Sequence, residues 1–236
     1  MKSKFLVSMI FILVLIVGVL WFYSNSESEV VSSERSKKVL LLPGYGGSHQ
    51  SLKPLGAELS SAGFEVRYAD LDDMKGDLKE YGERVGELIK KEREIINIIA
   101  YSAGGLVVRS AAGDSEAAKY IGSVVTIGSP HNGAQVAKLG ALLGGELCPT
   151  SCQQLNPDSR FLDELFTPNN PKRWLSIRSS ADEVVTPIES SILSGMRNLE
   201  VNSFCGEAKL SHGDLVGSKS TALLVIKFLK GEKLIC

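Results

Sequence analysis

The sequence predicts an α/β fold, in which a doubly wound, mostly parallel sheet carries helices on both faces. The first observation is that short apolar runs alternate with helix-like segments through most of the chain. The second is that these runs are continuously apolar, as in strands that are buried on both faces. The third is that glycine, serine or aspartate follows several runs, and parallel sheets place their chemistry at the carboxyl ends of their strands.

The first half of the fold is predicted from apolar runs and helical spacing. Residues 39–42, VLLL, predict a buried strand that stops before Pro43-Gly44. Residues 51–62 have helical spacing, and Gly63 ends that helix. Residues 64–69, FEVRYA, predict the next strand, and residues 74–93 predict a charged amphipathic helix. A strand–helix–strand–helix order of this kind indicates parallel neighbouring strands.

The second half continues the same alternation. Residues 95–100 predict a strand and residues 104–112 a helix. Residues 124–127, VVTI, predict a strand that stops at Gly128-Ser129-Pro130. Two further strands at 174–177 and 199–201 and a closing helix at 221–229 complete the predicted elements.

The chain begins with an apolar segment that is set apart from the folded domain. Phe5–Tyr23 reads FLVSMIFILVLIVGVLWFY, and as a helix it is about 28 Å long, close to the thickness of a bilayer core. Lys2 and Lys4 precede it, which favours a cytoplasmic amino terminus. We therefore expect residues 1–23 to be a signal anchor, 24–38 a polar linker and 39–236 the folded domain. The domain is then outside a single-pass anchor in the cell membrane; the competing interpretation is a cleaved signal peptide and a secreted protein.

Charge and cysteine content narrow the function classes. The sequence has 26 Lys and Arg against 27 Asp and Glu. This balance argues against a nucleic-acid-binding protein, which usually has an excess or a patch of basic residues. The four cysteines fit an exported domain, and we expect the pairs Cys148–Cys152 and Cys205–Cys236, although spacing does not fix the connectivity. A zinc site and free buried thiols are the alternatives; the spacing C-x-x-C of zinc sites does not occur. No metal or cofactor is expected, and we expect a monomer.

The stretch AYSAGG places Ser102 where a strand becomes a helix. A sharp turn there strains the serine backbone and exposes its hydroxyl above the sheet, and it requires small residues two positions away on each side. Here they are Ala100 and Gly104, so the sequence departs mildly from G-x-S-x-G. Ser102 is therefore a candidate nucleophile, and it needs a base.

Chain order selects the other two catalytic candidates. The histidines are His49, His131 and His212, and only His212 follows the last predicted strand, as the order nucleophile–acid–histidine requires. Asp182 lies at a strand end between Ser102 and His212, where a carboxylate would orient the imidazole. Glu183 is the nearest substitute for this acid.

Two backbone N–H groups are candidates for an oxyanion hole. Ala103 directly follows the nucleophile, and Tyr45 lies in the glycine-rich loop after the first strand of the domain. Gly44, Gly46 and Gly47 allow that loop to approach the site. A phosphate-binding loop is the weaker alternative, since no Gly-Lys-Ser/Thr follows.

Four segments together resemble the α/β-hydrolase superfamily, and more narrowly the small class 2 lipases and their inositol-deacylase relatives. The segments are VLLLPGYGG, NIIAYSAGGLVVR, VVTIGSPHNG, and SIRSSADEVVTPIESSIL followed by SHGDLV. The resemblance covers nearly all of residues 39–229. It implies the triad Ser102–Asp182–His212, an oxyanion hole from Tyr45 and Ala103, and hydrolysis of carboxylic esters. Together with the predicted anchor, we expect a membrane-tethered esterase or lipase acting on small-molecule or lipid esters.

The resemblance has departures that bear on substrate preference. Pro43 and Tyr101 stand where the family often has histidine, and Tyr101 and His131 are pocket candidates. Residues 138–145 are either a minimal mobile cap over an acyl pocket or an ordinary buried helix with a loop. An amidase, thioesterase or acyltransferase on the same fold, and a catalytically inactive surface-binding domain, are the alternative functions.

Overall fold

The computed structural model describes residues 36–46, 49–135, 137, 148–207 and 209–236. Residues from Arg35 to Cys236 form one compact unit. Three sequence predictions lie outside the described residues: the anchor at Phe5–Tyr23, all of the 24–38 linker except its last three residues, and the cap segment Lys138–Gly145. In the part of the chain that is described, no helix is both long and apolar enough to cross a membrane.

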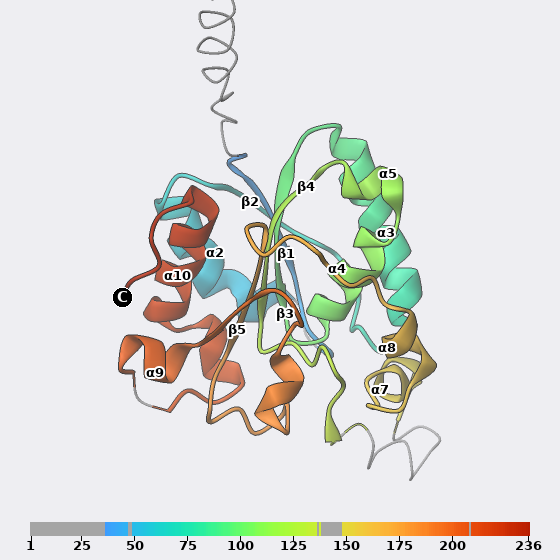
Figure 1. Ribbon diagram of the computed structural model, residues 1–236. Coiled ribbons are helices and arrows are strands. Elements are labelled where there is room, and N and C mark those ends of the chain that lie inside the picture. Colours follow the sequence, from blue (N-terminus) through green and yellow to red (C-terminus); the bar gives the residue numbers. More distant parts are fainter. Residues whose placement is uncertain (1–35, 47–48, 136, 138–147, 208) are drawn as a thin grey trace, which may run out of the picture. The chain divides into compact units, whose positions relative to one another are not determined.

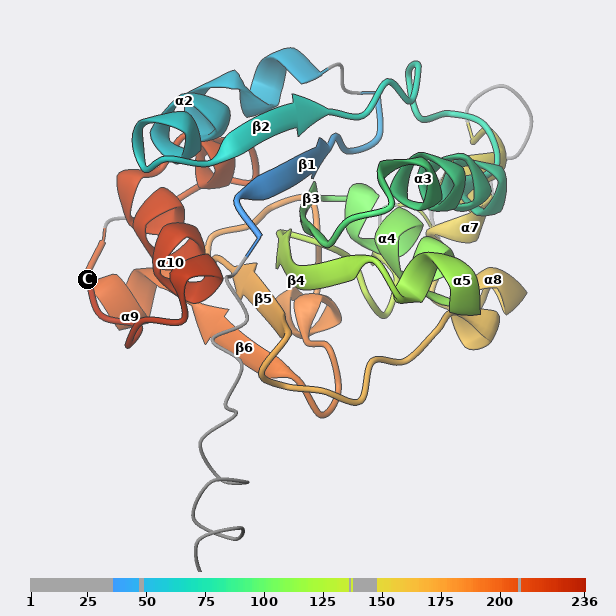
Figure 2. The same cartoon turned by 90° about the horizontal axis from the view of Figure 1, so that it is seen from above.

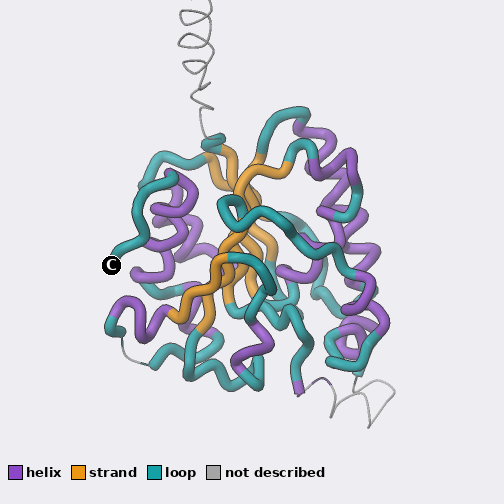
Figure 3. Tube along the Cα trace, viewed as in Figure 1, coloured by secondary structure: helices purple, strands orange, loops and turns teal. Residues whose placement is uncertain are grey.

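The centre of the fold is a parallel six-stranded sheet between two layers of helices (Figure 1, Figure 3). Its strand order is β2-β1-β3-β4-β5-β6, and each neighbouring pair is parallel. This is the predicted doubly wound arrangement. The strands are β1 (Lys38–Leu42), β2 (Glu65–Tyr68), β3 (Ile96–Tyr101), β4 (Ile121–Ile127), β5 (Trp174–Arg178) and β6 (Arg197–Glu200).

Helices cover both faces of the sheet (Figure 2). On one face lie α2 (Lys53–Ser61), α9 (Val201–Cys205) and α10 (Lys219–Lys230); on the other lie α3 (Leu78–Glu92), α4 (Gly104–Ala112), α5 (Ser115–Ala118), α7 (Thr150–Gln154) and α8 (Arg160–Glu164). Three short 3₁₀ helices complete the described elements, η1 (His49–Leu52), η3 (Ile188–Ser191) and η4 (Gly213–Val216).

Sequence periodicity explains the two longest helices. In α3 the buried positions include Leu78, Tyr81, Val85 and Ile89, which recur every three or four residues on one face. The Asp77 side chain caps this helix by accepting a hydrogen bond from the Lys79 N–H. In α10, Ser218 caps the start and Gly231 ends the helix in the left-handed conformation.

Two separate apolar cores lie on the two faces of the sheet. One packs α3 and α4 against side chains such as Leu40, Ile98 and Val124. The other packs α2 and α10 against Leu41, Ile99 and Val125. Successive residues of one strand point to opposite faces, so the continuous apolar runs of the sequence are required by burial on both sides.

Both disulfides expected from the sequence are present. Cys148 is bonded to Cys152 at the start of α7, and Cys205 at the end of α9 is bonded to Cys236. The second bond ties the carboxyl terminus to the segment that follows β6. The described residues contain no free cysteine.

Candidate active site

Ser102 lies directly after β3, at the point where the strand order reverses direction. Strand β1 has β2 on one side and β3 on the other, so the loops after β1 and β3 leave the sheet next to each other. Ligand sites of open parallel sheets lie at such switch points. The φ angle of Ser102 is 52°, in the left-handed region that a side chain disfavours, and its N–H donates to the Ile127 carbonyl at 2.8 Å. The predicted sharp turn is therefore present.

The small residues near Ser102 are required by close backbone contacts. A Cβ on Gly44 would lie 2.6 Å from the Ser102 Cβ, and a Cβ on Gly104 would lie 2.5 Å from the Pro43 carbonyl oxygen. Both distances are shorter than real Cβ contacts. The loop after β1 and the start of α4 can thus approach the serine only because these two positions lack side chains.

The structure brings the three predicted triad side chains into one hydrogen-bonded row. The distance from the His212 Nε2 to the Ser102 Oγ is 3.0 Å, and that from the His212 Nδ1 to the Asp182 Oδ2 is 2.7 Å. All three residues are buried, with exposed fractions of 9% for Ser102, 4% for Asp182 and 7% for His212. Such a row can accept the serine proton on one imidazole nitrogen while the carboxylate holds the other.

The Asp182 carboxylate is fixed by the backbone that follows it. Its Oδ1 accepts hydrogen bonds from the Val184 and Val185 N–H groups, at 2.9 and 2.8 Å, which leaves Oδ2 for the imidazole. Glu183, the substitute acid, does not contact the ring. Its Oε2 instead accepts a hydrogen bond from the backbone N–H of His212 at 3.1 Å.

Sequence reasoning did not predict two contacts around His212. Tyr101, expected in the pocket, lies against the His212 ring with centroids 5.0 Å apart, and its hydroxyl donates to the His212 carbonyl at 3.1 Å. Gly128 has a φ of 55°, and a Cβ there would lie 3.2 Å from the His212 Nδ1. The glycine after a strand, in GSPHNG, was the available signal for a close approach.

The two predicted oxyanion donors are chain neighbours of residues at the turn: Ala103 follows Ser102, and Tyr45 follows Gly44. Ala103 is the residue before the first turn of α4, where a backbone N–H has no acceptor within the helix. Gly44, directly before Tyr45, lies so close to Ser102 that an added Cβ would be 2.6 Å from the Ser102 Cβ. Gly46 has a φ of 67°, and its N–H donates to the Asp73 carbonyl. Gly47 lies outside the described residues.

His131, the other pocket candidate, lies in the interior behind the site. Its Nε2 is 2.9 Å from the Thr126 Oγ1, and its carbonyl accepts a hydrogen bond from the Arg109 guanidinium at 3.0 Å. Burial, and secondarily the Arg109 charge, lower the pKa of His131 from 6.5 to about 3. Burial also lowers the pKa of Arg109, to about 10. His131 is therefore neutral at ordinary pH and acts as part of the packing.

The depressed pKa of His131 makes a prediction about stability in acid. Below about pH 6.5 the unfolded chain binds a proton at His131, whereas the folded protein does so only near pH 3. Unfolding takes up a proton in this window, so the free energy of unfolding falls as pH falls, by roughly 2–3 kcal/mol at pH 4.5 from this group. We expect His131→Gln to be less stable than wild type at pH 7.5 and the difference to shrink toward pH 4.5, measured by urea unfolding.

A matched control separates this effect from general acid sensitivity. His49 is half-buried in η1, with its ring beside Tyr68 at a centroid distance of 5.4 Å. The His49→Gln protein should follow the wild-type pH dependence. A constant difference between His131→Gln and wild type from pH 7.5 to 4.5 would contradict the buried, neutral histidine.

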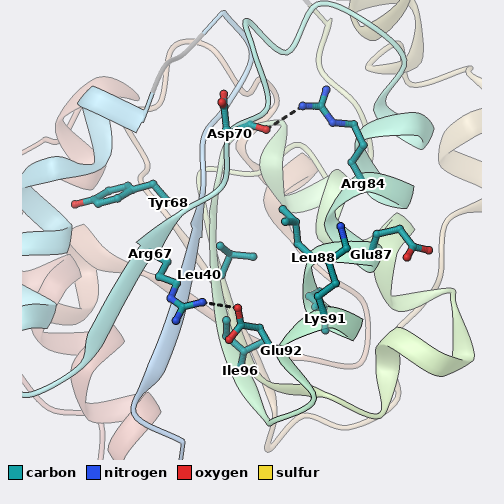
Figure 4. Close-up of a pocket in the computed structure, with 11 residues that line it drawn as sticks. Leu40, Arg67, Tyr68, Asp70, Arg84, Glu87, Leu88, Lys91, Glu92 and Ile96 are labelled. Atoms are coloured by element: carbon teal, nitrogen blue, oxygen red, sulfur yellow. Dashed lines mark hydrogen bonds and ion pairs between the residues drawn. The ribbon is translucent and has the colours of Figure 1, made fainter.

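A separate cavity of about 470 Å³ lies between β2 and α3 (Figure 4). Leu40 and Ile96 form part of its wall, Arg67 forms an ion pair with Glu92, and Arg84 donates to the Asp70 carbonyl at 3.0 Å. None of the triad side chains lines it. We therefore assign this cavity no part in the chemistry at Ser102.

Among the described residues, no group of three or more His, Cys, Asp or Glu side chains is arranged to hold a metal ion. The acidic and histidine side chains at the site are engaged with one another: Asp182 and His212 form the pair already described. The chemistry that these residues themselves can supply is nucleophilic attack by Ser102 with His212 as base.

Comparison with known proteins identifies the family. The model of the palmitoyl protein thioesterase family matches residues 39–172, more than half of the chain. The chain belongs to the palmitoyl protein thioesterase family. The matched segment contains Ser102 and both predicted oxyanion residues, whereas Asp182 and His212 lie beyond it. None of the curated proteins compared with the chain matches it.

Solved structures share the fold of this family member at low sequence identity. Mature Bacillus licheniformis lipase BlEst2 is 18% identical, with a TM-score of 0.65, covering 82% of this chain and 92% of the lipase. Paleococcus ferrophilus monoacylglycerol lipase is 16% identical, with a TM-score of 0.56, covering 83% of this chain and 94% of that one. The ydeN gene product of Bacillus subtilis is 12% identical, with a TM-score of 0.55, covering 84% and 100%. The predicted α/β-hydrolase relationship is confirmed, and the family member is a hydrolase in the broad sense.

Proposed function

We propose that the protein hydrolyses carboxylic acyl esters through an acyl-enzyme formed on Ser102. The observation that carries the proposal is the row Ser102–His212–Asp182, with distances of 3.0 and 2.7 Å. Serine is a weak nucleophile by itself, and a base within hydrogen-bond reach, oriented by a third group, is the arrangement that activates it.

The proposed reaction has two halves. In the first, the Ser102 Oγ attacks the acyl carbon while the His212 Nε2 takes its proton, and the Tyr45 and Ala103 N–H groups stabilise the oxyanion. His212 then gives this proton to the leaving alcohol, and the acyl group remains on Ser102. In the second half, water attacks the acyl-serine with His212 as base, and the free acid leaves. Asp182 keeps the imidazole in the required tautomer and stabilises the imidazolium.

Thioester hydrolysis is the second candidate, because the matched family is named for palmitoyl protein thioesterase. The same residues serve both reactions. A thiol has a pKa of about 8–9, so a thiolate leaves with less help from proton transfer than an alkoxide does. The two candidates therefore differ in the leaving group rather than in the roles of Ser102 and His212.

Matched substrates test the proposal and separate its two forms. We expect the full-length protein to cleave acyl esters, with kcat/KM rising from acetyl to palmitoyl, because each buried CH₂ stabilises the bound acyl chain by about 0.8 kcal/mol. The measurement compares acyl-N-acetylcysteamine with its oxygen analogue carrying the same acyl chain. A thioester preference of about tenfold or more, or about 1.4 kcal/mol, would identify a thioesterase; a smaller ratio would identify a general esterase.

The amide of the same acyl chain serves as the control for this series. Turnover of the amide without turnover of either ester would contradict the proposal and favour an amidase. Acyl transfer to an added alcohol in place of release of the acid would favour an acyltransferase. A flat response to chain length would contradict a lipid-like acyl substrate while leaving ester hydrolysis in place.

We also propose that the protein is exported, with the domain outside the cell membrane and residues 5–23 as its anchor. The described chain enters the sheet at Lys38, at the amino end of β1, whereas Ser102 follows the carboxyl end of β3. In a parallel sheet these ends lie at opposite edges, so the linker joins the domain on the side away from the site. Amino-terminal sequencing of the cell-derived protein distinguishes a retained anchor from a cleaved, secreted form.

A further inference from the structure

The backbone N–H and carbonyl of His212 are each held by a side chain from a distant part of the chain. The Glu183 Oε2 accepts a hydrogen bond from the His212 N–H at 3.1 Å, and the Tyr101 hydroxyl donates one to the His212 carbonyl at 3.1 Å. Tyr101 is the last residue of β3, and Glu183 follows the proposed acid after β5. Two segments far apart in the chain thus meet on one residue.

Tyr101 also contacts the imidazole itself. Its ring centroid lies 5.0 Å from that of His212, and the two ring planes are tilted by 32°. At this distance an aromatic face attracts a cation, so the imidazolium that forms during attack is favoured by the tyrosine ring. Burial, followed by the charges of Asp182 and Glu183, raises the pKa of Tyr101, so its hydroxyl stays protonated and remains a donor at any pH used for assay.

We infer that Tyr101 and Glu183 act together as a positioning clamp on His212. This inference rests on the proposed function, because the clamp acts on the imidazole that serves Ser102. The clamp holds the backbone of His212 so that its ring stays between the Ser102 hydroxyl and the Asp182 carboxylate. Glu183 contacts only the backbone of His212, and Tyr101 contacts its backbone and ring, so both act through His212.

The need for a clamp follows from where His212 lies. It directly precedes the short helix η4 (Gly213–Val216), so no strand or longer helix fixes its backbone. Loop residues move on nanosecond to microsecond timescales unless they are held. A displacement of about 1 Å in a catalytic group can lower the rate 100-fold. The two backbone hydrogen bonds oppose such a displacement of His212, the proposed base.

The two halves of the clamp differ in strength. Tyr101 is half-buried, whereas Glu183 is exposed, so water competes more readily for the Glu183 carboxylate. Exposed charged groups contribute little compared with buried hydrogen bonds. Tyr101 should therefore carry the larger share of the effect.

A double-mutant cycle on the full-length protein tests the clamp. Loss of one hydrogen bond and of positioning should lower kcat about tenfold in Tyr101→Phe and about threefold in Glu183→Ala, with KM changed less than about twofold. Glu183→Gln keeps an oxygen acceptor and should restore kcat to within about twofold of wild type. Because both residues hold one backbone, the double variant should lose less than the product of the two single losses.

Hydrogen exchange provides a readout that does not depend on activity. Amides in residues 209–216 should exchange faster in Tyr101→Phe and in Glu183→Ala than in wild type, as measured by mass spectrometry. The matched controls are Tyr120→Phe, a half-buried tyrosine packed against the other apolar core, and Glu58→Gln on the exposed face of α2. Neither control should change kcat or the exchange of residues 209–216.

The outcomes separate the clamp from the proposed function. Unchanged exchange in Tyr101→Phe and Glu183→Ala would overturn the clamp, whether or not the wild type hydrolyses esters. Faster exchange with unchanged kcat would overturn the positioning role and leave a structural contact. Multiplicative losses in the double variant would show that the two residues act independently, and would also overturn it. A wild type that neither hydrolyses nor labels at Ser102 would overturn the proposed function instead, and the exchange result would still decide the clamp.

Discussion

Replacing Ser102 with alanine should lower the turnover of acyl esters by roughly 10⁴–10⁶-fold, the loss typical when a member of such a triad is removed. The reason is that the Ser102 hydroxyl is the only atom of the row that can form the acyl bond, while His212 and Asp182 act on its proton. A fluorophosphonate probe reacts with the same oxygen and should no longer label the protein. Turnover and labelling are measured on the same preparation.

The control for this experiment is Ser60→Ala, on the exposed face of α2. This variant should keep wild-type turnover and labelling. Both variants should melt within a few degrees of wild type. At the φ of 52° alanine and serine both carry a Cβ and meet the same strain, and at Ser60 alanine is a good helix former on an exposed face. Wild-type labelling in Ser102→Ala would contradict the proposed nucleophile, and absent labelling in folded wild type would favour the inactive binding domain.

The sequence predicted the sheet because burial on both faces leaves a strong mark. A strand such as β3 is buried along nearly its whole length and is apolar at most positions, with Asn97 as a buried polar exception. The predicted strand at 95–100 overlaps the observed Ile96–Tyr101 at five residues. The same holds for β1 and for α3, whose apolar face repeats at helical spacing. Where burial imposes the pattern, the pattern predicts the element.

Shorter or less regular elements escaped prediction for physical reasons. Strand β4 begins at Ile121, three residues before the predicted start. Gly has low strand propensity, and Gly122 and Ser123 lie at an irregularity in the pairing with β3, where the Ser123 N–H donates to the Asn97 side-chain oxygen. Val201 was predicted to end the last strand, but it begins α9, where its side chain is fully buried. Helices of four or five residues, such as α5 and α7, are too short to show a period.

The candidate active site also has a part that the sequence predicts and a part that it does not. Ser102, Asp182 and His212 could be selected because strand ends and chain order place them at one edge of the sheet, and the structure brings their side chains together. The contacts of Tyr101 and Glu183 with the His212 backbone depend on the path of two loops, which no periodicity records. The sequence therefore identified Tyr101 and Glu183 as residues near the site, but it did not predict that both contact the backbone of His212.

Replacing Gly44 with alanine should lower kcat/KM roughly 100-fold, the loss expected when a catalytic group moves by about 1 Å. The new Cβ would lie 2.6 Å from the Ser102 Cβ and 3.2 Å from the Tyr101 carbonyl oxygen. Ser102 cannot yield, because its N–H is bonded to Ile127 in β4. The loop after β1 must move instead, and Tyr45 moves with it, so the variant should lose the proposed oxyanion donor as well as the fit around the nucleophile. Steady-state kinetics on the ester series measures the loss.

The matched control for Gly44→Ala is Gly86→Ala in α3. There the nearest atom to the added Cβ is that of Ala117, at 3.7 Å, which is an ordinary contact. Alanine favours a helix over glycine by up to about 1 kcal/mol, so this protein should melt at the same or a higher temperature with unchanged turnover. If Gly44→Ala also kept wild-type turnover, the loop would be able to retreat without cost, and the Tyr45 N–H could not be a fixed donor to the oxyanion. If Gly44→Ala instead lost activity while still folding cooperatively, unfolding could not explain the loss. The loss would then come from displacement of the loop that carries Tyr45, because an oxyanion is stabilised only by donors that are fixed before the charge develops.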